Sequence, residues 1–382
     1  MRRRIPRPLA AAVLIPLAAT VAACSSSGGG GSSPSSSPSA AKMQGAALPA
    51  APASSPASIT ETGSTLLFPL FGTWSTAYQK LYKQVTITTG GTGSGTGITD
   101  ASTGTVNIGA SDAYLSSADV AKYPGLLNIP LAISAQQINY NVPGLNDVHL
   151  NLSGPVIAGI YDGSIRFWDD AKIKSINAKY AAKLPHEAII PIHRSDGSGD
   201  TFIFSQYLSF STPSWKNGPG YGTTITWPAV QNGVGANGNP GMVQACQSTK
   251  YSIAYIGVSF LNETNKAGLG YAALLNRAGN FVLPTEPNIA AAANELVSKT
   301  PKDERISLIF APGKNSYPII NYEYMIINPK QSSPQTADAL KRFLAWALDQ
   351  GQSKRYLDQV HFIPLPKSIV NLSKEQIAQI SG

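Results

Sequence analysis

The stretch His-Arg-Ser-Asp-Gly-Ser-Gly-Asp-Thr-Phe-Ile-Phe at residues 193–204 places an arginine, two serines and two glycines directly before an apolar run. The run predicts the start of a helix, whose first N–H groups have no partner inside the helix. Glycines let the backbone approach an oxyanion closely, and the Arg194 guanidinium matches the oxygens of a phosphate or carboxylate. The stretch therefore indicates an anion site, although a loop that caps an ordinary helix has the same composition.

Around this stretch the sequence alternates between strand and helix patterns. Short apolar runs rich in branched residues predict strands at residues 85–88, 106–110, 189–192, 253–256 and 319–327. A helix is predicted to begin at Ile98. Apolar residues three and four apart predict another over 336–350, with Pro334 near its start and Gly351 as its C-cap. The alternation predicts an α/β fold with right-handed crossovers, in which loops gather at the carboxyl ends of parallel strands.

The glycine-rich segment 90–97 follows one of the predicted strands. Its glycines alternate strictly from 91 to 97, so it matches neither the dinucleotide fingerprint Gly-x-Gly-x-x-Gly nor a P-loop that ends in Gly-Lys-Ser/Thr. What remains is a strand, a loop that offers N–H groups and the Ser94 hydroxyl, and a helix start, an arrangement suited to a small anion. A flexible turn is the alternative for this segment taken alone.

Two further segments have the same character. Residues 61–71 place a Gly/Ser/Thr turn just before an apolar helix pattern, and residues 109–114 end a short strand with Asp112. A carboxylate repels an anion unless the ligand carries a proton, and phosphate near neutral pH keeps one or two protons whereas sulfate keeps none. Asp112 as acceptor of a P–OH proton would therefore favour phosphate over sulfate by roughly several kcal/mol. A helix N-cap or a salt-bridge partner is the alternative role.

The first 58 residues predict export and membrane anchoring. Four arginines within residues 2–7 precede an apolar run too short to span a membrane, so residues 1–23 are predicted to be a signal peptide. The run ends in Val-Ala-Ala-Cys, the pattern of a lipoprotein signal in which Cys24 is acylated with chains such as palmitate and becomes the N-terminus. A plain signal peptide is the alternative. Residues 24–58, mostly Ser, Gly, Pro and Ala, predict a disordered tether.

Composition narrows the classes of function. Residues 59–382 are enough for one or two domains with a buried core. Removal of residues 1–23 takes away four arginines and no acidic residue, so the formal charge falls from +8 to +4, which gives little support to nucleic-acid binding. The four histidines, at 149, 186, 193 and 361, show no metal-ligand spacing, and neither a metal nor another cofactor is expected.

Four segments, in this order, resemble the phosphate-binding lipoproteins of bacterial phosphate-specific (Pst) ABC transporters. They are Gly-Ser-Thr-Leu-Leu-Phe-Pro at 63–69, Gly-Thr-Gly-Ser-Gly at 91–95, Gly-Ala-Ser-Asp at 109–112 and Arg-Ser-Asp-Gly-Ser-Gly at 194–199. The similarity is greatest to the mycobacterial, lipid-anchored members. It runs from about residue 60 to 380 and includes residues 132–137, 317–324 and 362–366.

The resemblance implies a type II periplasmic-binding-protein fold. In this α/β fold two lobes with mixed or parallel sheets are joined by a two-strand hinge, and the ligand lies in the cleft between the lobes. The implied first lobe comprises residues 59–138 and 318–382, and the implied second lobe comprises residues 139–317.

The resemblance also implies a role for each site residue. The first lobe would contribute hydroxyl and backbone N–H donors and one acceptor of the phosphate proton: Ser64, Thr65, Leu66 and Ser94 as donors, and Asp112 as acceptor. The second lobe would contribute a guanidinium and donors at a helix start: Arg194, oriented by Asp196, with Ser198, Gly199 and Asp200.

Two positions depart from the family pattern. Asp200 stands where many relatives carry Thr. A backbone contact alone would be tolerable there, but a carboxylate beside a dianion would cost affinity unless it points to solvent. The partner that Cys246 has in similar lipoproteins corresponds to Ser252 here, so Cys246 is expected to be a buried thiol instead of half of a disulfide.

The resemblance implies a high-affinity inorganic phosphate-binding subunit, monomeric and lipid-anchored on the extracytoplasmic face of the cell membrane. It would deliver phosphate to a permease driven by a cytoplasmic ATPase. A phosphatase or phosphoryl transferase is the rival class, but the sequence shows no nucleophile–base or metal-ligand cluster, so no enzyme activity is expected. A receptor for sulfate or molybdate is a second alternative, against which Asp112 argues. An adhesive or antigenic surface lipoprotein is a third, and it would not need Arg194, Ser94 and Asp112 together.

Overall fold

The computed structural model describes residues 55–382. The predicted signal peptide, the lipidation site Cys24 and nearly all of the predicted tether therefore lie outside the described residues. The tether was predicted to reach residue 58, but strand β1 (Ala57–Gly63) begins earlier because Ala57 pairs with Val85. None of the helices in residues 55–382 is long and apolar enough to cross a membrane.

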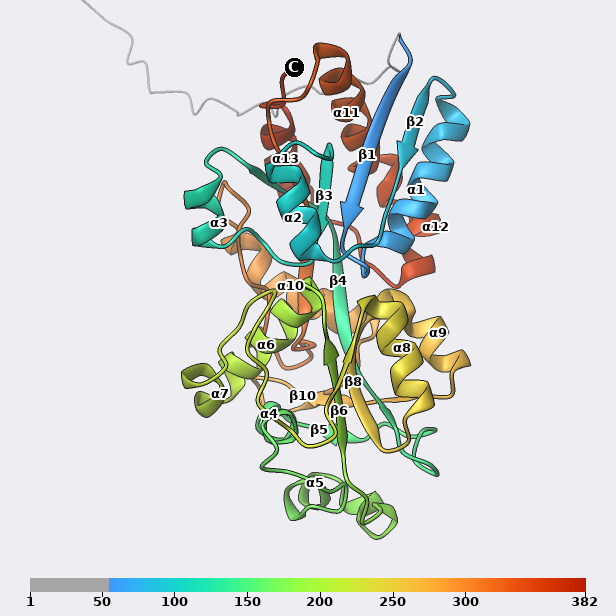
Figure 1. Ribbon diagram of the computed structural model, residues 1–382, viewed down its shortest axis with the longest axis vertical. Coiled ribbons are helices and arrows are strands. Elements are labelled where there is room, and N and C mark those ends of the chain that lie inside the picture. The colour runs from blue at the N-terminus through green and yellow to red at the C-terminus, as the bar shows by residue number, and fades with distance from the viewer. Residues whose placement is uncertain (1–54) are drawn as a thin grey trace, which may run out of the picture. The chain divides into compact units, whose positions relative to one another are not determined.

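A mixed sheet of nine strands forms the centre of the described residues (Figure 1). Its strand order is β2-β1-β3-β12-β4-β8-β6-β7, and β9 pairs with β4. The strands are β1, β2 (Val85–Thr88), β3 (Ile108–Ser111), β4 (Leu127–Asn141), β6 (Ile190–Arg194), β7 (Val234–Ala236), β8 (Ser252–Gly257), β9 (Gly270–Tyr271) and β12 (Ile320–Ile327). A smaller sheet, in the order β11-β10-β5, contains β5 (Asn151–Leu152), β10 (Ala273–Leu275) and β11 (Phe281–Val282).

Strand β4 runs through both parts of the large sheet. Its residues 127–135 pair antiparallel with β12, and residues 136–141 pair antiparallel with β8. We call β1, β2, β3, β12 and their helices the first half of the molecule, and β6, β7, β8 and their helices the second half. Within each half the outer strands are parallel to one another, so the mixed sheet expected from the sequence is confirmed.

Helices cover the strands of both halves. Figure 1 shows α1, α2, α3, α11, α12 and α13 around the first half and α4 to α9 around the second. The helices are α1 (Phe68–Leu81), α2 (Ser94–Ser102), α3 (Ser117–Lys122), α4 (Gly154–Tyr161), α5 (Ala171–Ile176), α6 (Gly199–Ser211), α7 (Pro213–Asn217), α8 (Gly238–Ser248), α9 (Leu261–Lys266), α10 (Glu286–Leu296), α11 (Pro334–Ala347), α12 (Lys354–Leu357) and α13 (Lys367–Ile377).

An aromatic cluster packs α1 against α11 in the first half. Phe71 and Tyr78 of α1 contact Phe343 of α11, and Trp74 contacts Trp346, with ring centroids 5.2 to 6.4 Å apart. The α11 residues face inward because they recur at helical spacing, as the sequence predicts. Large aromatic side chains bury much apolar area, so this cluster stabilises the first half and fixes both helices on the sheet.

Two predicted helix boundaries were wrong. Helix α11 ends at Ala347, and Gly351 lies in a following 3₁₀ turn where its carbonyl accepts the indole N–H of Trp74 at 3.1 Å. Helix α2 begins at Ser94 instead of Ile98. It includes Gly97, at which a Cβ atom would lie only 2.6 Å from the Ala110 carbonyl oxygen. Close packing of this helix on β3 thus overrides the weak helix propensity of glycine.

Candidate functional site

The carboxyl ends of three strands meet at one place in the molecule. Ser64 follows β1 and Asp112 follows β3 in the first half, and Arg194 ends β6 in the second half. The halves touch here, because the Gly95 N–H at the start of α2 donates to the Gly197 carbonyl at 2.9 Å. The four segments singled out in the sequence therefore lie together, as expected for loops at the carboxyl ends of parallel strands.

Asp112 is held by two hydroxyl groups. Its Oδ1 accepts from the Ser64 hydroxyl, its Oδ2 accepts from the Ser94 hydroxyl at 3.3 Å, and its N–H donates to Ser94 Oγ at 3.2 Å. The residue is 2% exposed. Burial raises the pKa of Asp112 to about 7, and the nearby Asp200 carboxylate adds to the rise. Asp112 is therefore a fixed carboxyl group that can exchange a proton near neutral pH, and it is not a helix N-cap.

Arg194 is buried between two carboxylates. Its Nε donates to Asp196 Oδ1 at 2.7 Å, its Nη2 donates to Asp196 Oδ2, and its Nη1 donates to Asp200 Oδ2 at 2.8 Å. Partial burial pushes the pKa of Asp196 upward, but the hydrogen bonds and charge of Arg194 outweigh it and hold that pKa below its usual value. Three of the five N–H donors of the guanidinium are thus used, and the other two are left for a ligand.

The side chain of Asp200 does not point to solvent, the orientation in which a carboxylate at this position would cost a bound anion least. It is fully buried, and besides Arg194 it accepts from Asn239 Nδ2 at 2.7 Å and from Gln136 Nε2 at 3.0 Å. Three donors satisfy the carboxylate, so its burial does not leave an unpaired charge. Asp200 thus fixes the Arg194 guanidinium and ties α6 to α8 and β4.

The start of α6 lies directly against Asp112. Ser198 is its N-cap and accepts from the Thr201 N–H at 3.2 Å. A Cβ atom added at Gly199 would lie 2.5 Å from both Asp112 Oδ2 and Ser94 Oγ. Only glycine fits here. Because Ser198 caps the Thr201 N–H, the N–H groups of Gly199 and Asp200 are the ones in the first turn that lack a partner in the helix.

A second glycine of the site shows why segment 90–97 is rich in glycine. Gly93 has a positive φ of 95°, and a Cβ atom there would lie 2.5 Å from Asp196 Oδ2. The glycine-rich segment therefore packs against the loop before α6. It has this role in addition to forming the turn and the helix start that the sequence suggests.

The residues after β1 make more hydrogen bonds within the protein than the sequence suggests. The Ser64 N–H donates to the Ala110 carbonyl at 2.9 Å, and Ser64 Oγ accepts from the Leu67 N–H at 2.9 Å. Thr65 Oγ1 accepts from the backbone and side-chain N–H groups of Asn239, at 3.1 and 3.0 Å. A contact of Ser64 with a ligand would therefore require its hydroxyl to leave Asp112, whereas the hydroxyl hydrogen of Thr65 is not used by Asn239.

Leu66 is fully buried at the contact of the two halves. Its carbonyl accepts from the Ser259 hydroxyl at 2.7 Å, and its side chain occupies the space where a Cβ atom of Gly257 would lie. Leu66 thus packs between the halves and offers a ligand only its backbone N–H.

Four residues of the site were not found from the sequence as functional: Gln136, Asn239, Tyr255 and Glu323. The hydroxyl of Tyr255 accepts the Arg194 N–H at 2.8 Å and lies 2.7 Å from Thr201 Oγ1. Glu323 is the one charged residue of its strand, a signal that could have marked it. Gln136 shares β4 with five other Asn, Ser and Gln residues and does not stand out. Asn239, in a Gly-Asn-Pro-Gly context typical of a turn, gives no such signal.

The predicted thiol is confirmed as a buried, free cysteine. Cys246 is fully buried, and the Ser252 hydroxyl lies 3.4 Å from its Sγ. Burial raises the pKa of Cys246 to about 12, so the thiol stays protonated. The two positions that the resemblance pairs are thus neighbours in space.

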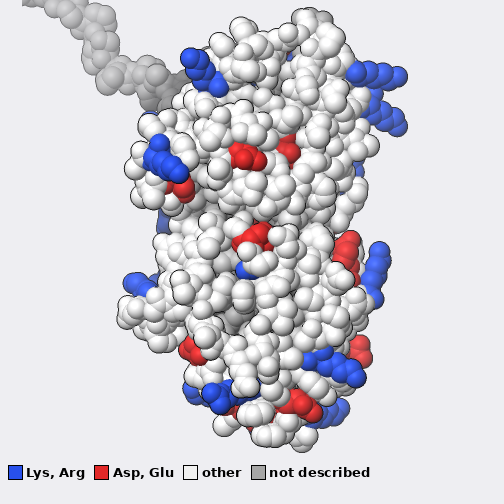
Figure 2. Space-filling model, viewed as in Figure 1, with Lys and Arg blue, Asp and Glu red and all other residues white. Residues whose placement is uncertain are grey.

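Residues 55–382 contain no cluster of three or more His, Cys, Asp or Glu side chains that could hold a metal ion. Figure 2 shows lysine and arginine side chains in ones and twos around the margins of one face, without a broad basic patch on that face. A flat nucleic-acid interface would need such a patch.

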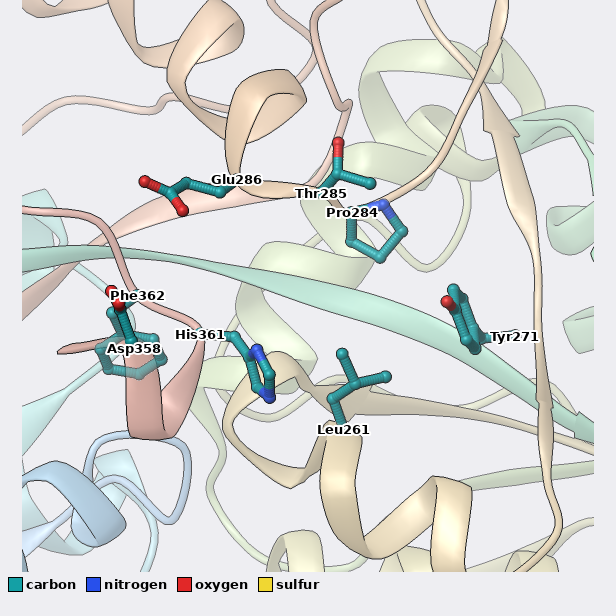
Figure 3. A pocket seen from close by; sticks show the side chains of 8 residues that line it. All are labelled: Leu261, Tyr271, Pro284, Thr285, Glu286, Asp358, His361 and Phe362. Carbon is teal, nitrogen blue, oxygen red and sulfur yellow. The ribbon is translucent and has the colours of Figure 1, made fainter. Parts of the chain in front are cut away.

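A separate pocket of about 330 Å³ lies outside the site (Figure 3). Its lining residues are Leu261, Tyr271, Pro284, Thr285, Glu286, Asp358, His361 and Phe362. At its rim Lys354 pairs with Glu286 at 3.0 Å and with Asp358 at 3.3 Å. None of the lining residues belongs to the predicted site. Both acidic side chains of the lining, Glu286 and Asp358, are already paired with Lys354.

Comparison with known proteins identifies the family. A family model described as PBP superfamily domain matches residues 50–350. The chain is 36% identical to the phosphate-binding protein PstS of Methanocaldococcus jannaschii over 338 residues, which cover 84% of this chain and 86% of that protein. It is 32% identical to the phosphate-binding protein PstS 3 of Mycobacterium leprae over 291 residues, which cover 72% and 74%.

Among solved structures, the phosphate-binding protein of Stenotrophomonas maltophilia has the same fold, with a TM-score of 0.64 at 19% identity over 83% of this chain and 93% of that chain. The chain therefore belongs to the PstS family of the PBP superfamily and has its two-lobed type II periplasmic-binding-protein fold.

Proposed function

We propose that this chain binds inorganic phosphate between its two halves and delivers it to the permease of an ABC importer driven by a cytoplasmic ATPase. One observation carries the proposal: an acceptor from the first half, Asp112, faces donors from the second half at the start of α6, next to the buried Arg194. A ligand that fits must carry both a proton to donate and charged oxygens to accept. Phosphate near neutral pH is such an anion. The relatives of this chain that are named phosphate-binding proteins agree with this choice.

The proposed ligand set follows from the donors that remain. Asp112 accepts the P–OH proton, and Arg194 donates from the two N–H groups not used by Asp196 and Asp200. Backbone N–H groups donate at Gly199 and Asp200 and in the turn after β1. The remaining members of the set are the hydroxyls of Thr65 and Ser198 and the Leu66 N–H. The hydroxyls of Ser64 and Ser94 join the set only by turning from Asp112 to the ligand.

We propose further that the halves move as lobes, with residues 59–138 and 318–382 in one and residues 139–317 in the other. The polypeptide passes between them at β4 and just before β12. Only the closed arrangement brings Asp112 and Gly199 together, so phosphate would stabilise closure by satisfying donors from both lobes.

The proposed ligand set lacks an activated nucleophile, so the chain acts as a binding protein and not as an enzyme. Isothermal titration of the full chain with phosphate tests the proposal, with submicromolar binding expected and no measurable binding contradicting it. Incubation with a chromogenic phosphomonoester should release no product. Molybdate that binds as tightly as phosphate would instead favour the alternative of a different oxyanion receptor.

The anchor is a separate part of the proposal, because it rests on residues outside the described range. Acylation of Cys24 would hold the protein on the extracytoplasmic face of the membrane as a monomer. Cys24→Ser should move the protein out of the membrane fraction, because one Ser/Gly/Pro tether has no apolar surface to hold a bilayer. Phosphate affinity should stay unchanged. A variant that remains with washed membranes would contradict the assignment.

A further inference from the structure

A second buried carboxyl group lies behind Asp112. Glu323 is the one charged residue of β12, and it is fully buried. Its Oε1 accepts from the Ser134 hydroxyl and from Asn321 Nδ2 at 3.0 Å. Its Oε2 is enclosed and accepts no hydrogen bond from a donor among the described residues. A carboxylate in this position would leave a buried oxygen with a full share of charge unpaired.

The hydrogen atoms around Glu323 are too few for the contacts observed. The single Ser134 hydroxyl hydrogen faces two acceptors, Asn321 Oδ1 at 2.7 Å and Glu323 Oε1. The two hydrogens of Asn321 Nδ2 face the Asp112 carbonyl, the Tyr322 carbonyl and Glu323 Oε1, at 3.1, 2.9 and 3.0 Å. Three hydrogens thus serve five contacts. An ionised Glu323 would need full donors at its oxygens, so this shortage favours the neutral, protonated form, whose carbonyl oxygen Oε1 tolerates shared donors.

No positive charge compensates Glu323. Strands β3 and β4, which flank β12, carry no charged side chain, and α2 carries only Asp100, at the end away from the site. Helix α10 carries Glu286 and Glu295, both exposed. Asp112 is the titratable neighbour that faces Glu323, and Arg194 is bound to Asp196 and Asp200 instead. Burial raises the pKa of Glu323 well above its usual value and Asp112 raises it further, so Asp112 ionises first.

We propose that Glu323 is a positioning residue that keeps its proton and presents it to Asp112, so that Asp112 remains a charged acceptor for the proton of bound phosphate. The inference rests on the proposed function, because Glu323 would control the protonation state of Asp112 in the same phosphate site. Two adjacent carboxyl groups hold one proton here, and the structure assigns it to the group farther from the cleft. The group at the cleft is then free to accept from the ligand.

Two substitutions separate this role from simple packing. Glu323→Gln keeps the shape and a donor but cannot ionise, whereas Glu323→Met fills the space without a donor. Phosphate affinity is measured for both and for the parent from pH 5.5 to 9. We expect the Gln variant to follow the parent within about threefold. The Met variant should bind about tenfold more weakly, as expected for loss of a hydrogen bond to a charged group.

The pH profile gives a readout that packing alone would not move. Loss of the donor raises the pKa of Asp112, so Asp112 stays protonated over a wider range. The acid limb of phosphate binding should then shift to higher pH, by about one unit, in Glu323→Met and not in Glu323→Gln. Glu304→Gln is the matched control, because Glu304 is also fully buried but contacts Ser373 and Gln376. Its pH profile should match that of the parent.

The proposal is overturned if Glu323→Gln binds as weakly as Glu323→Met, or if Glu323→Met matches the parent. A parent that binds phosphate at no pH refutes the proposed function itself. If neither variant folds by circular dichroism, carbon-13 NMR of the parent with labelled glutamate carboxyl groups decides. A protonated carboxyl resonance at pH 7 that shifts on addition of phosphate supports the role, and its absence overturns it.

Discussion

The two halves of the molecule bring different chemistry to the same site. In the described residues the first half contributes hydroxyl groups and one exchangeable carboxyl group, with Ser64 and Ser94 holding Asp112, and no cation. The second half contributes Arg194, whose charge is already met by two carboxylates, and the N–H groups at the start of α6. The difference suggests a division of labour in which the second half attracts an anion and the first half selects one that carries a proton.

Removing the cation of the second half should weaken phosphate binding more than any other substitution considered below. Arg194→Ala should weaken phosphate binding by roughly 2 to 3 kcal/mol, because charge-assisted hydrogen bonds are lost. The substitution also leaves the Asp200 carboxylate without its charged partner. Arg194→Lys should recover only part of the affinity, since the fork geometry is lost. Titration calorimetry measures both, with circular dichroism to verify the fold.

Arg166→Ala is a matched control for Arg194, because Arg166 also belongs to the second half but is exposed. It should leave phosphate affinity unchanged. Unchanged affinity in both Arg194 variants, with the fold intact, would remove Arg194 from the proposed site.

The contact between the halves should also be needed for phosphate binding. Gly199→Ala puts a methyl group 2.5 Å from Asp112 Oδ2 and Ser94 Oγ, so the halves cannot close fully. Phosphate affinity should fall at least roughly tenfold, about 1.4 kcal/mol, while the melting temperature without ligand changes little. Gly72→Ala in α1, where a Cβ atom meets no neighbour within 4 Å, is the control. Equal affinity for the two variants would show that binding does not need this contact.

A substitution in the first half tests selection directly. Asp112→Asn keeps the shape of the side chain but can turn an amide N–H toward the ligand. Phosphate affinity should fall by less than in Arg194→Ala, and sulfate affinity should rise, so that the ratio between the two anions shrinks. Competition titrations with both anions measure the ratio. A variant that still rejects sulfate as the parent does would show that Asp112 is not the proton acceptor.

Glu61 belongs to the first half but lies away from the site, so its substitution is expected to leave phosphate binding unchanged. It lies in β1, is 3% exposed, and neither carboxyl oxygen has a hydrogen-bond partner among residues 55–382. Burial raises the pKa of Glu61 to about 8. The folded state thus holds a proton that the unfolded state releases above its ordinary pKa near 4.5, so the free energy of unfolding falls as pH rises from about 4.5 to about 8.

Denaturant unfolding at several pH values tests this prediction for Glu61. Glu61→Gln should lose part of the pH dependence, on the order of 1.4 kcal/mol per pH unit at most within that window. Glu187→Gln, at an exposed position, should retain the dependence of the parent. If the parent and Glu61→Gln have parallel curves, Glu61 is ionised in the folded protein.

Local sequence patterns were sufficient to predict a structural feature where that feature depends on one short segment. The predicted strands that became β2, β3, β6, β8 and β12 and the helix start after Ser198 lie within short runs of sequence and were found, whereas β1 and β4 were not predicted. The pairing of Arg194 with Asp196 was implied by the family resemblance and is present in the structure. The fate of Asp200 depends on Gln136 and Asn239, which are 64 and 39 residues away along the chain, so no local pattern could show that its carboxylate points inward. The proton on Glu323 depends in the same way on neighbours in other strands.

In the proposed function both halves bind one anion, and that anion must carry a proton. The most direct test is calorimetric titration of the full chain with phosphate and with sulfate, under identical conditions near neutral pH. A buried acceptor left facing an unprotonated oxygen costs roughly 3 kcal/mol or more, so phosphate should bind at least roughly a hundredfold more tightly than sulfate. Equal affinities for the two anions would contradict the claim.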